Sequence, residues 1–482
     1  MLLGELVRDL SVEIPADGVD INSITADSRE VTSGALFAAL SGARADGASY
    51  IGEAVAAGAA AILVDNAVEL GDLDLPVLRA KDPRRLLALM AARFYPRQPE
   101  QLVAVTGTSG KTSVAVFARQ IFEHAGKKAA SIGTIGVVGP RGIEKGSLTT
   151  PDPVALHRLL DRLATEDGVT HAALEASSHG LDQRRLDGLR LTAAGFTNLG
   201  RDHLDYHADS AAYLAAKLRL FRDILPQTAT AVINADSDLA IELVAAATAS
   251  GARLMLVGKA GIDIRIVAAH ADGLRQHLEL ELVGHAINVD LPLAGRFQAD
   301  NAVMAAGLAI AAGIEPERAI ASLADLQGPV GRLEKVAETP NGAAIFIDYA
   351  HKPEAIEAAL SALRKVTSGR LIVVFGAGGD RDKGKRPLMG EAAARLADIL
   401  IVTDDNPRSE EPAAIRAEIV AGAPDAREIP GRGEAINEAV SMLRDGDVLC
   451  VAGKGHETGQ TVAGEVLPFS DHEAVREALA SR

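Results

Sequence analysis

The last third of the chain alternates short apolar runs with longer amphipathic segments. The apolar runs have the length of strands and cover residues 344–348, 371–375, 399–403 and 448–452. In the other segments apolar residues recur every three or four positions, which predicts helices over 353–366, 386–397, 412–421 and 435–444. This alternation indicates a mostly parallel sheet with helices on both faces, so we expect a Rossmann-like α/β domain here.

The preceding residues show the same alternation with one interruption. An Ala-rich helix over 50–60 leads into a strand at 61–65, a helix follows Pro83, and a strand at 102–105 begins the next unit. Between 258 and 290, Ile, Val and Leu stand at alternate positions. That spacing predicts an antiparallel insert in an otherwise parallel sheet.

The domain boundaries follow from chain length and turn residues. A chain of 482 residues is long enough for about three domains of roughly 150 residues each. Residues 328–332, Gly-Pro-Val-Gly-Arg, predict a hinge. We therefore expect an α/β protein with a small N-terminal domain over 1–82, a central domain over 83–329 and a C-terminal domain over 330–482.

Composition excludes several classes of protein. With 48% hydrophobic and 24% charged residues the chain has the balance of a globular protein. A net charge of −16, 3% aromatic residues and no Trp argue against a nucleic-acid-binding surface. Cys450 is the single cysteine, so neither an internal disulfide nor a cysteine zinc site is available. These features favour a reducing compartment, and we expect the cytoplasm.

Neither export nor membrane insertion is expected. Glu5 and Asp9 interrupt the N-terminal segment where a signal peptide needs an apolar run. The longest apolar stretch, residues 301–314, is shorter than the ~18 residues that a membrane span requires.

A glycine-rich loop follows the apolar strand that ends near Val105 and precedes a helix. Its residues are Gly107, Thr108, Ser109, Gly110, Lys111, Thr112 and Ser113. Backbone N–H groups in such a loop bind phosphate oxygens, the lysine adds a charge and the hydroxyl of Thr112 suits Mg²⁺. The loop predicts binding of ATP or GTP in the central domain. Val105 stands where the common motif has its first glycine.

Polar residues also follow other predicted strands. Glu175 and His203 each lie after an apolar run and are candidates for Mg²⁺ ligands. For either residue taken alone, a loop cap and a surface histidine are the preferred interpretations. Lys217 lies beside the apolar face of a predicted helix, where a solvated lysine is the usual interpretation. In the C-terminal domain the segments after the strands are 348–351, 376–381, 404–408 and 453–457. They should meet at one sheet edge, where such folds bind ligands.

Six of these motifs occur in the order found in the Mur ligases. They cover residues 107–112, 175–180, 197–207, 348–351, 378–387 and 405–408. More narrowly, the set resembles the UDP-N-acetylmuramoyl-tripeptide synthetases, which add the third residue of the peptidoglycan stem peptide, and it spans nearly the whole chain. The shortened phosphate loop is the form that this family has. The resemblance implies an N-terminal UDP-binding domain and a central P-loop ATPase domain. It also implies a ligase that uses ATP to activate the carboxylate of UDP-N-acetylmuramoyl-L-alanyl-D-glutamate as an acyl phosphate.

The resemblance also implies roles for individual residues at the ATP site. Thr112 and Glu175 would serve one Mg²⁺, and His203 a second one shared with Lys217 as a carbamylated lysine. Asn301 would contact adenine, Asp348 the ribose and Arg332 the γ-phosphate, with Lys111 completing the catalytic set. For Arg332, a solvated linker arginine is the alternative.

The UDP-linked substrate would lie across the first two domains. The implied contacts are Ser28, Ala43, Arg44, Ala45, Thr149, Thr150, Ser177, Gln183 and Arg185. The chain departs from its relatives at 43–45 and at Leu148, where many members carry Asn.

The incoming amino acid would bind the C-terminal domain. The implied contacts are Arg381, Asp405, Asn406, Pro407, Arg408, Gly453 and Glu457. Arg408 suits the second carboxylate of meso-diaminopimelate, which it can bind through two charge-assisted hydrogen bonds; lysine offers no such group. Alternatives are the same reaction with L-lysine, another Mur or folylpolyglutamate-type ligase, and a nucleotide-switched binding protein. For the Arg408 side chain, the alternative interpretation is a surface residue at the entry to a helix. We expect a monomer.

Overall fold

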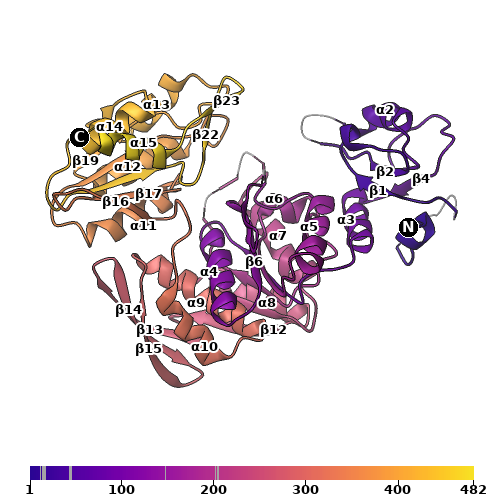
Figure 1. Cartoon of the computed structure of the whole chain (residues 1–482), viewed down its shortest axis with the longest axis horizontal. Helices are drawn as coiled ribbons and strands as arrows, with labels where there is room; N and C mark the ends of the chain where they lie inside the picture. Colours follow the sequence, from indigo (N-terminus) through magenta and orange to yellow (C-terminus); the bar gives the residue numbers. More distant parts are fainter. Residues whose placement is uncertain are drawn as a thin grey trace.

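The computed structural model describes residues 1–10, 12, 18–42, 46–146, 148–200, 202–203 and 206–481. Three α/β domains follow one another along the chain (Figure 1). The first lies at one end of the molecule, the second in the middle, and the third beside the second, far from the first. The predicted α/β class with mostly parallel sheets is confirmed.

The first sheet has the order β1-β2-β3-β4 and is parallel throughout. Its strands are β1 Ser23–Thr25, β2 Ala35–Ala38, β3 Ala61–Asp65 and β4 Val77–Ala80. Its helices are α1 Leu3–Leu6, α2 Ile51–Ala56, α3 Pro83–Phe94 and 3-10 turns at Ser28–Glu30 and Gly47–Tyr50. The helix predicted after Pro83 is α3, and it begins there because the Asp82 carboxylate accepts the N–H of Arg85 and proline suits the first turn.

The central sheet has the order β15-β14-β13-β12-β11-β10-β5-β9-β6-β7-β8. Its strands are β5 Gln101–Thr106, β6 Ala129–Gly133, β7 Gly136–Gly139, β8 Gly142–Glu144, β9 His171–Glu175, β10 Ala193–Phe196, β11 Thr230–Asn234, β12 Arg253–Gly258, β13 Ile264–Asp272, β14 Arg275–Leu282 and β15 His285–Leu291. The strands from β13 to β6 pair in parallel, and antiparallel strands extend both edges. The antiparallel insert predicted between 258 and 290 is confirmed as β13 to β15.

Helices cover both faces of the central sheet. They are α4 Lys111–His124, α5 Pro153–Thr165, α6 Ser178–Asp182, α7 Ser210–Arg219 with a π-turn at Leu220–Ile224, α8 Ala240–Ala249, α9 Arg296–Ala311, α10 Pro316–Ala321 and a 3-10 turn at Ser322–Asp325. Val103 and Val105 of β5 join the core with α4 and α9, while Leu102 and Ala104 join the core of the opposite face. This is the two-residue alternation of a strand buried on both sides.

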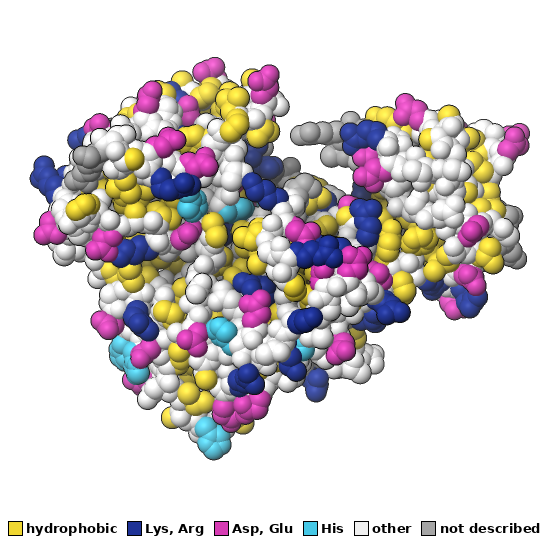
Figure 2. Space-filling model, viewed as in Figure 1, with side chains coloured by type: hydrophobic (Ala, Val, Ile, Leu, Met, Phe, Trp, Pro, Cys, Tyr) yellow, Lys and Arg dark blue, Asp and Glu magenta, His cyan; other side chains and the backbone are white. Residues whose placement is uncertain are grey.

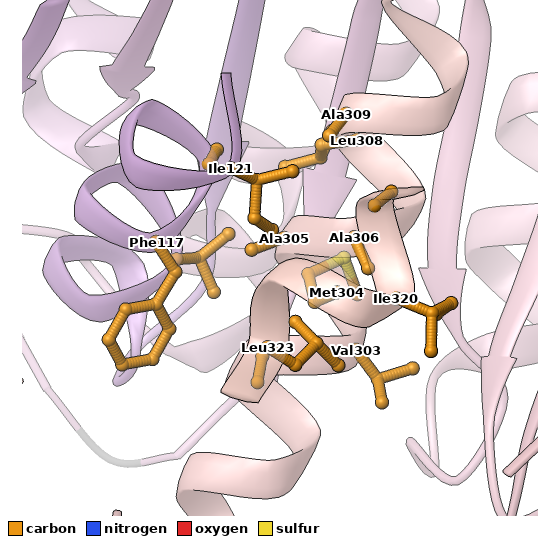
Figure 3. Packing of buried hydrophobic residues seen from close by; sticks show 14 of the residues in the cluster. Phe117, Ile121, Val303, Met304, Ala305, Ala306, Leu308, Ala309, Ile320 and Leu323 are labelled. Carbon is orange, nitrogen blue, oxygen red and sulfur yellow. The ribbon is translucent and has the colours of Figure 1, made fainter. Parts of the chain in front are cut away.

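Small residues let α9 pack closely beside α4. Figure 3 shows Ala305 and Met304 of α9 beside Phe117 and Ile121 of α4. Because alanine side chains are short, the two helices can approach closely over the sheet. This contact fixes α4, and with it the phosphate loop at its N-terminus.

The third sheet has the order β16-β17-β21-β18-β19-β20, with only the edge strand β16 antiparallel. The strands are β16 Glu334–Glu338, β17 Ala344–Asp348, β18 Leu371–Phe375, β19 Ile399–Val402, β20 Arg427–Glu428 and β21 Val448–Ala452, with a separate hairpin of β22 Gly459–Val462 and β23 Glu465–Pro468. The helices are α11 Pro353–Arg364, α12 Lys385–Leu396, α13 Pro412–Val420, α14 Arg432–Ser441 and α15 Asp471–Ala480. The predicted strands and helices are confirmed to within three residues at each end. The hydrophobic pattern did not predict β16, β20, the hairpin or α15.

The third domain packs onto the central one. Leu274 and Phe297 of the central domain lie against the core that contains Leu360 and Leu363 of α11. Gly295 lies so close to α11 that a Cβ there would be 2.9 Å from the Cβ of Ala362. In the space-filling view an open notch separates the first domain from the third, and acidic and basic side chains are interspersed over this face (Figure 2). Within the described ranges, no helix has the length and apolar character needed to cross a membrane.

Candidate functional site

The phosphate loop lies at the carboxyl end of β5, in the middle of the central sheet. Gly107 and Gly110 have φ values of +143° and +88°, which other residues rarely adopt. A Cβ on Gly107 would also collide with Thr197, and one on Gly110 with Asn301. Both glycines are therefore required by backbone conformation and by close approach.

The lysine of this loop is half-buried and held against the backbone. Lys111 Nζ donates to the carbonyl oxygens of Gly107 at 2.8 Å and Thr108 at 3.0 Å. Burial, together with the nearby ammonium of Lys352, lowers the pKa of Lys111 to about 8. An anion in the cavity would favour its charged form.

A cavity of about 490 Å³ opens beside the loop, between the central and third domains. The central domain contributes the loop together with Thr134, Thr149, Glu175, Ser177, Ser178, Asn198, Leu199, Gly200, Asp202, His203, Lys217, Phe297, Gln298 and Asn301. The third domain contributes residues 348–352 and one face of α11, and Arg332 comes from the predicted hinge. A ligand on the phosphate loop would thus contact two domains at once.

Arg332 reaches the phosphate loop from the hinge. Its Nη2 donates to Thr112 Oγ1 at 3.1 Å, and its guanidinium lies 4.5 Å from the ring centroid of Tyr349. Stacking on the aromatic ring orients the guanidinium while leaving other N–H groups available. A solvated linker arginine, the alternative interpretation, would not make these two contacts.

Glu175 is buried at the end of β9 and is held by one neighbour. Thr134 donates its N–H at 2.8 Å and its hydroxyl at 3.1 Å to the two carboxylate oxygens. A Cβ on Gly133 would collide with the same carboxylate. Both carboxylate oxygens are therefore fixed beside the cavity.

Lys217 is buried, with 1% of its surface exposed. Its Nζ donates to Gly107 O at 2.7 Å and lies 4.4 Å from the ring centroid of Tyr213. Burial and the neighbouring Lys111 and Lys352 lower its pKa well below the ordinary value. The solvated helix lysine that the pattern allowed is therefore wrong.

His203 lines the cavity next to Asp202, its neighbour in the chain. Its Nε2 lies 3.1 Å from Asp202 Oδ2, and its ring packs edge-on against His179 with centroids 4.7 Å apart. Burial is the main cause that lowers its pKa to about 3, so the ring is neutral near pH 7. Thr112, Glu175, His203 and Lys217 all line the cavity. Among the described residues, no three His, Cys, Asp or Glu side chains are grouped to hold a metal by themselves.

Asn301 and Asp348 lie on two walls of the cavity. Asn301, on α9, donates to Gln298 Oε1 at 3.2 Å. Asp348 ends β17 and accepts the N–H of Leu333 at 2.5 Å and of Ala350 at 2.7 Å. Burial raises the pKa of Asp348 to about 6.

The residues predicted to bind the UDP-linked substrate fall into two groups. Thr149 and Ser177 line the cavity, and the buried Thr150 lies behind them, donating to Glu175 O at 2.8 Å and accepting the N–H of Ser177 at 3.0 Å. Arg185 donates to Thr150 O at 2.7 Å and to Gln183 Oε1 at 2.8 Å.

Ser28 belongs to the other group and lies in the first domain, in the 3-10 turn that Asp27 caps. It is not part of the cavity wall. Ala43, Arg44 and Ala45 lie outside the described residues.

The predicted amino-acid contacts cluster at the carboxyl ends of β18, β19 and β21. Asn406 Nδ2 donates to Asp405 Oδ1 and to Glu457 Oε2, both at 2.9 Å, and Lys454 Nζ donates to Glu457 Oε2 at 3.0 Å. Gly453 has φ +109°, and a Cβ there would be 2.6 Å from Asp405.

Arg408 joins this cluster from a strained backbone. It has φ +55° and donates from Nη1 to Gly379 O at 2.7 Å, while Pro407 precedes it in the same loop. Arg381 is exposed in the neighbouring loop. The cluster does not line the cavity, but Tyr349 links the two, since its hydroxyl lies 3.5 Å from Glu457 Oε1.

Several residues that line the cavity were not singled out from the sequence, among them Thr134, Asp202, Tyr349 and Lys352. Tyr349 lies inside a motif that was recognised, and Lys352 follows it directly. Extending that motif by one residue would have found Lys352. Thr134 carries no sequence signal, because its importance comes from its contact with the distant Glu175.

Family models match all three domains. The model for the Mur ligase family, catalytic domain, matches residues 20–95; that for the Mur ligase middle domain matches 105–309; and that for the Mur ligase, glutamate ligase domain, matches 331–455.

Individual proteins match over the full length. The chain is 56% identical to the UDP-N-acetylmuramoyl-L-alanyl-D-glutamate--2,6-diaminopimelate ligase of Bradyrhizobium diazoefficiens, covering 100% of both chains. A solved structure of a ligase with the same name has a TM-score of 0.72 at 31% identity, covering 100% of this chain and 99% of that chain. The MurF ligase from Thermotoga maritima in complex with ADP shares the fold, with a TM-score of 0.65 at 20% identity over 96% of this chain and 97% of that chain. The chain belongs to the Mur ligase family.

Proposed function

We propose that this protein is an ATP-dependent ligase that joins meso-diaminopimelate to UDP-N-acetylmuramoyl-L-alanyl-D-glutamate in peptidoglycan precursor synthesis. The full-length matches to ligases named for this reaction, at 56% and 31% identity, support this choice of substrates. One structural observation carries the proposal. The phosphate loop, a buried carboxylate and an arginine of the hinge converge on one cavity, next to a second polar cluster on the third domain.

The chemistry is carboxylate activation. The γ-phosphoryl group moves from ATP to an oxygen of the glutamate side-chain carboxylate, and ADP leaves. The amine of diaminopimelate then attacks the acyl carbon, phosphate leaves with the former carboxylate oxygen, and the nitrogen gives up a proton that the departing phosphate can accept. Lys111 and Arg332 would balance the charge that develops on the transferred group, and closure of the third domain would exclude water from the acyl phosphate.

ATP is the nucleotide that fits the site best. Asn301 on α9 would contact adenine and Asp348 the ribose, with the phosphates on residues 107–113. The ADP bound to a protein of the same fold supports this choice.

The donor set also suits Mg²⁺. Thr112 offers a hydroxyl, and Glu175 offers a carboxylate already oriented by Thr134, while the neutral ring of His203 can bind a metal. Phosphate oxygens would complete the coordination. When bound, Mg²⁺ would neutralise part of the phosphate charge.

Lys217 would serve as a carbamate. Burial lowers the pKa of its amine, which favours the neutral form that can attack CO₂. The attack forms an N–C bond and releases a proton, leaving a negatively charged group near Gly107. Such an anion would face the same metal site as His203.

The Lys217→Ala variant tests this role. We expect kcat to fall by roughly 100-fold, since an anion near the metal site is lost. A short-chain carboxylate such as acetate should restore part of the activity by occupying the space of the carbamate. Turnover equal to that of the wild type, or a loss that no carboxylate restores, would contradict the carbamate.

The UDP-linked substrate would extend from the first domain into the cavity. Thr149, Thr150, Ser177, Gln183 and Arg185 would hold its muramoyl dipeptide. Ser28 and residues 43–45 would bind its uridine diphosphate. Leu148 replaces the frequent Asn, which leaves main-chain contacts available at that point.

The amino acid would bind next to Arg408. Arg408 and Arg381 would take the distal carboxylate of diaminopimelate, while Glu457 and Asp405 suit its ammonium groups. Asn406, Pro407 and Gly453 would shape the pocket. L-Lysine lacks the distal carboxylate and would leave Arg408 without its partner.

Phosphate release separates this proposal from a nucleotide switch. With ATP and Mg²⁺ held constant, a ligase releases phosphate only when both the UDP-dipeptide and the amino acid are present. A switch would hydrolyse ATP slowly whatever amino acid is added, and that result would refute the proposal.

We also propose the domain boundaries at 82/83 and 329/330, a monomeric state and a cytoplasmic location. The second boundary lies in the gap between the family-model matches that end at 309 and begin at 331. The first match ends at 95, past the first boundary, and α3 packs in the core of the first domain. Light scattering coupled to size-exclusion chromatography measures the oligomeric state.

A further inference from the structure

Lys352 is a buried lysine at the junction of two domains. It is the N-cap residue of α11 in the third domain, and only 8% of its side chain is exposed. Its Nζ lies 2.6 Å from Asp202 Oδ2 of the central domain and donates to Thr108 O at 3.5 Å. An ammonium from the third domain therefore contacts the phosphate loop itself.

The surroundings of Lys352 are rich in positive charge. Lys111, Lys217 and Arg332 line the same cavity and come from three different parts of the chain. Burying an ammonium is costly unless anions surround it. Asp202 supplies one such anion, and the phosphates of a bound nucleotide would supply more.

We propose that Lys352 binds the γ-phosphoryl group of ATP, so that the third domain supplies a lysine of its own to the phosphate loop. The inference rests on the proposed function only in taking ATP as the nucleotide. An ammonium has three N–H donors, so Lys352 can keep its contact with Asp202 while it donates to a phosphate oxygen. As the γ-phosphoryl group leaves ADP for the carboxylate, Lys352 forms no covalent bond and stabilises negative charge on the transferred oxygens.

The competing role for Lys352 is a latch that only holds the two domains together through Asp202. The two roles differ in their dependence on the γ-phosphate. A latch affects every nucleotide alike, whereas a γ-phosphate contact affects ATP and spares ADP.

Nucleotide titrations of the full-length protein with Mg²⁺ distinguish these roles. For Lys352→Met we expect the Kd of the non-hydrolysable ATP analogue adenylyl imidodiphosphate to rise roughly 10- to 100-fold, the effect of one charge-assisted hydrogen bond. The Kd of ADP should change by less than about threefold. Lys352→Arg should recover part of the difference, because it keeps the charge. An equal change for both nucleotides, or no change for either, overturns the proposal.

Lys145→Met is the matched control. Lys145 also links the central and third domains, with Nζ 3.2 Å from Thr458 Oγ1, but it does not line the cavity. This variant should bind both nucleotides as the wild type does. A selective loss of the ATP analogue in Lys145→Met would overturn the proposal, because the effect would then belong to domain contact in general.

A second comparison covers the possibility that Lys352→Met leaves Asp202 unpaired and does not fold. The Asp202→Asn/Lys352→Met double variant buries no unpaired charge, and it is compared with Asp202→Asn alone. The selective loss of the ATP analogue should persist in this pair, and its absence overturns the proposal. A wild-type protein that binds neither nucleotide would instead refute the proposed function.

Discussion

His157 lies in the protein interior on α5, where burial lowers the pKa of its imidazole to about 4. Its Nε2 lies 3.2 Å from Asp187 O, so the neutral ring donates there. An unfolded chain would bind a proton near pH 6.5, whereas the folded protein does not until about pH 4. Because the unfolded state binds more protons between these values, stability falls as the pH falls through this window.

Urea unfolding of the wild type and of His157→Gln at pH 7 and pH 5 measures this effect. The free energy of unfolding should fall by about 2 kcal/mol more in the wild type than in the variant, as the linkage of one shifted histidine predicts. His285→Gln, at an exposed histidine, controls for removal of a ring. Equal pH dependence in the wild type and His157→Gln would mean that His157 takes up its proton at the same pH in the folded protein as in the unfolded chain.

The phosphate loop and α4 act as one element, and Gly110 is the residue where they join. Gly110→Ala should raise the Kd of ATP at least roughly tenfold, because the added methyl group collides with Asn301 and displaces the loop. It should also lower the free energy of unfolding by about 1–2 kcal/mol, the cost of a positive φ.

Gly126→Ala separates these two effects. Gly126 follows α4, has φ +77° and has no described atom within 4 Å of an added Cβ. This variant should lose stability as Gly110→Ala does, but it should bind ATP normally. A similar loss of ATP binding in both variants would show that backbone strain, rather than the contact with Asn301, governs the loop.

The same elements show how far the sequence predicts the fold. The strands β17, β18 and β21 have the predicted bounds, because each is an apolar run buried on both faces and bounded by polar residues. The residues of β23 are all exposed, so no alternation marks the strand. The helix α15 begins with Asp471, His472 and Glu473, and only its later turns contribute apolar residues to a core.

The candidate site could also be predicted only in part, because some of its contacts leave no local pattern in the sequence. The phosphate loop has a local signature, and the segments after parallel strands meet by topology. The contact between Arg332 and Thr112 joins residues 220 positions apart, and the pairing of Lys352 with Asp202 crosses two domains. Such contacts depend on how the domains pack, and no local spacing of residues predicts that packing.

At the scale of the whole molecule, the hinge sets the position of the third domain. Gly331 has φ +68°, and a Cβ there would collide with the backbone of Gly455 and His456. Gly331→Ala should therefore push the hinge away from that loop and move Arg332 from the cavity. We expect kcat to fall at least roughly tenfold with a much smaller change in ADP affinity.

Small-angle scattering with an ATP analogue tests the cause. The radius of gyration of Gly331→Ala should exceed that of the wild type under the same conditions. Gly313→Ala is the control, since Gly313 has φ +87° but no described neighbour within 4 Å of the added Cβ. If both variants lose activity equally while the scattering is unchanged, the hinge does not control the site.

The proposed reaction is tested most sharply by the mass of the product made with each amino acid. The purified protein receives ATP, Mg²⁺ and UDP-N-acetylmuramoyl-L-alanyl-D-glutamate together with either meso-diaminopimelate or L-lysine. The proposed function predicts a UDP product heavier by diaminopimelate minus one water, with kcat/KM at least roughly 100-fold above that for lysine. Arg408→Lys should lose most of this preference. A product that contains lysine and not diaminopimelate, or phosphate release without any new amide, would contradict the proposed function.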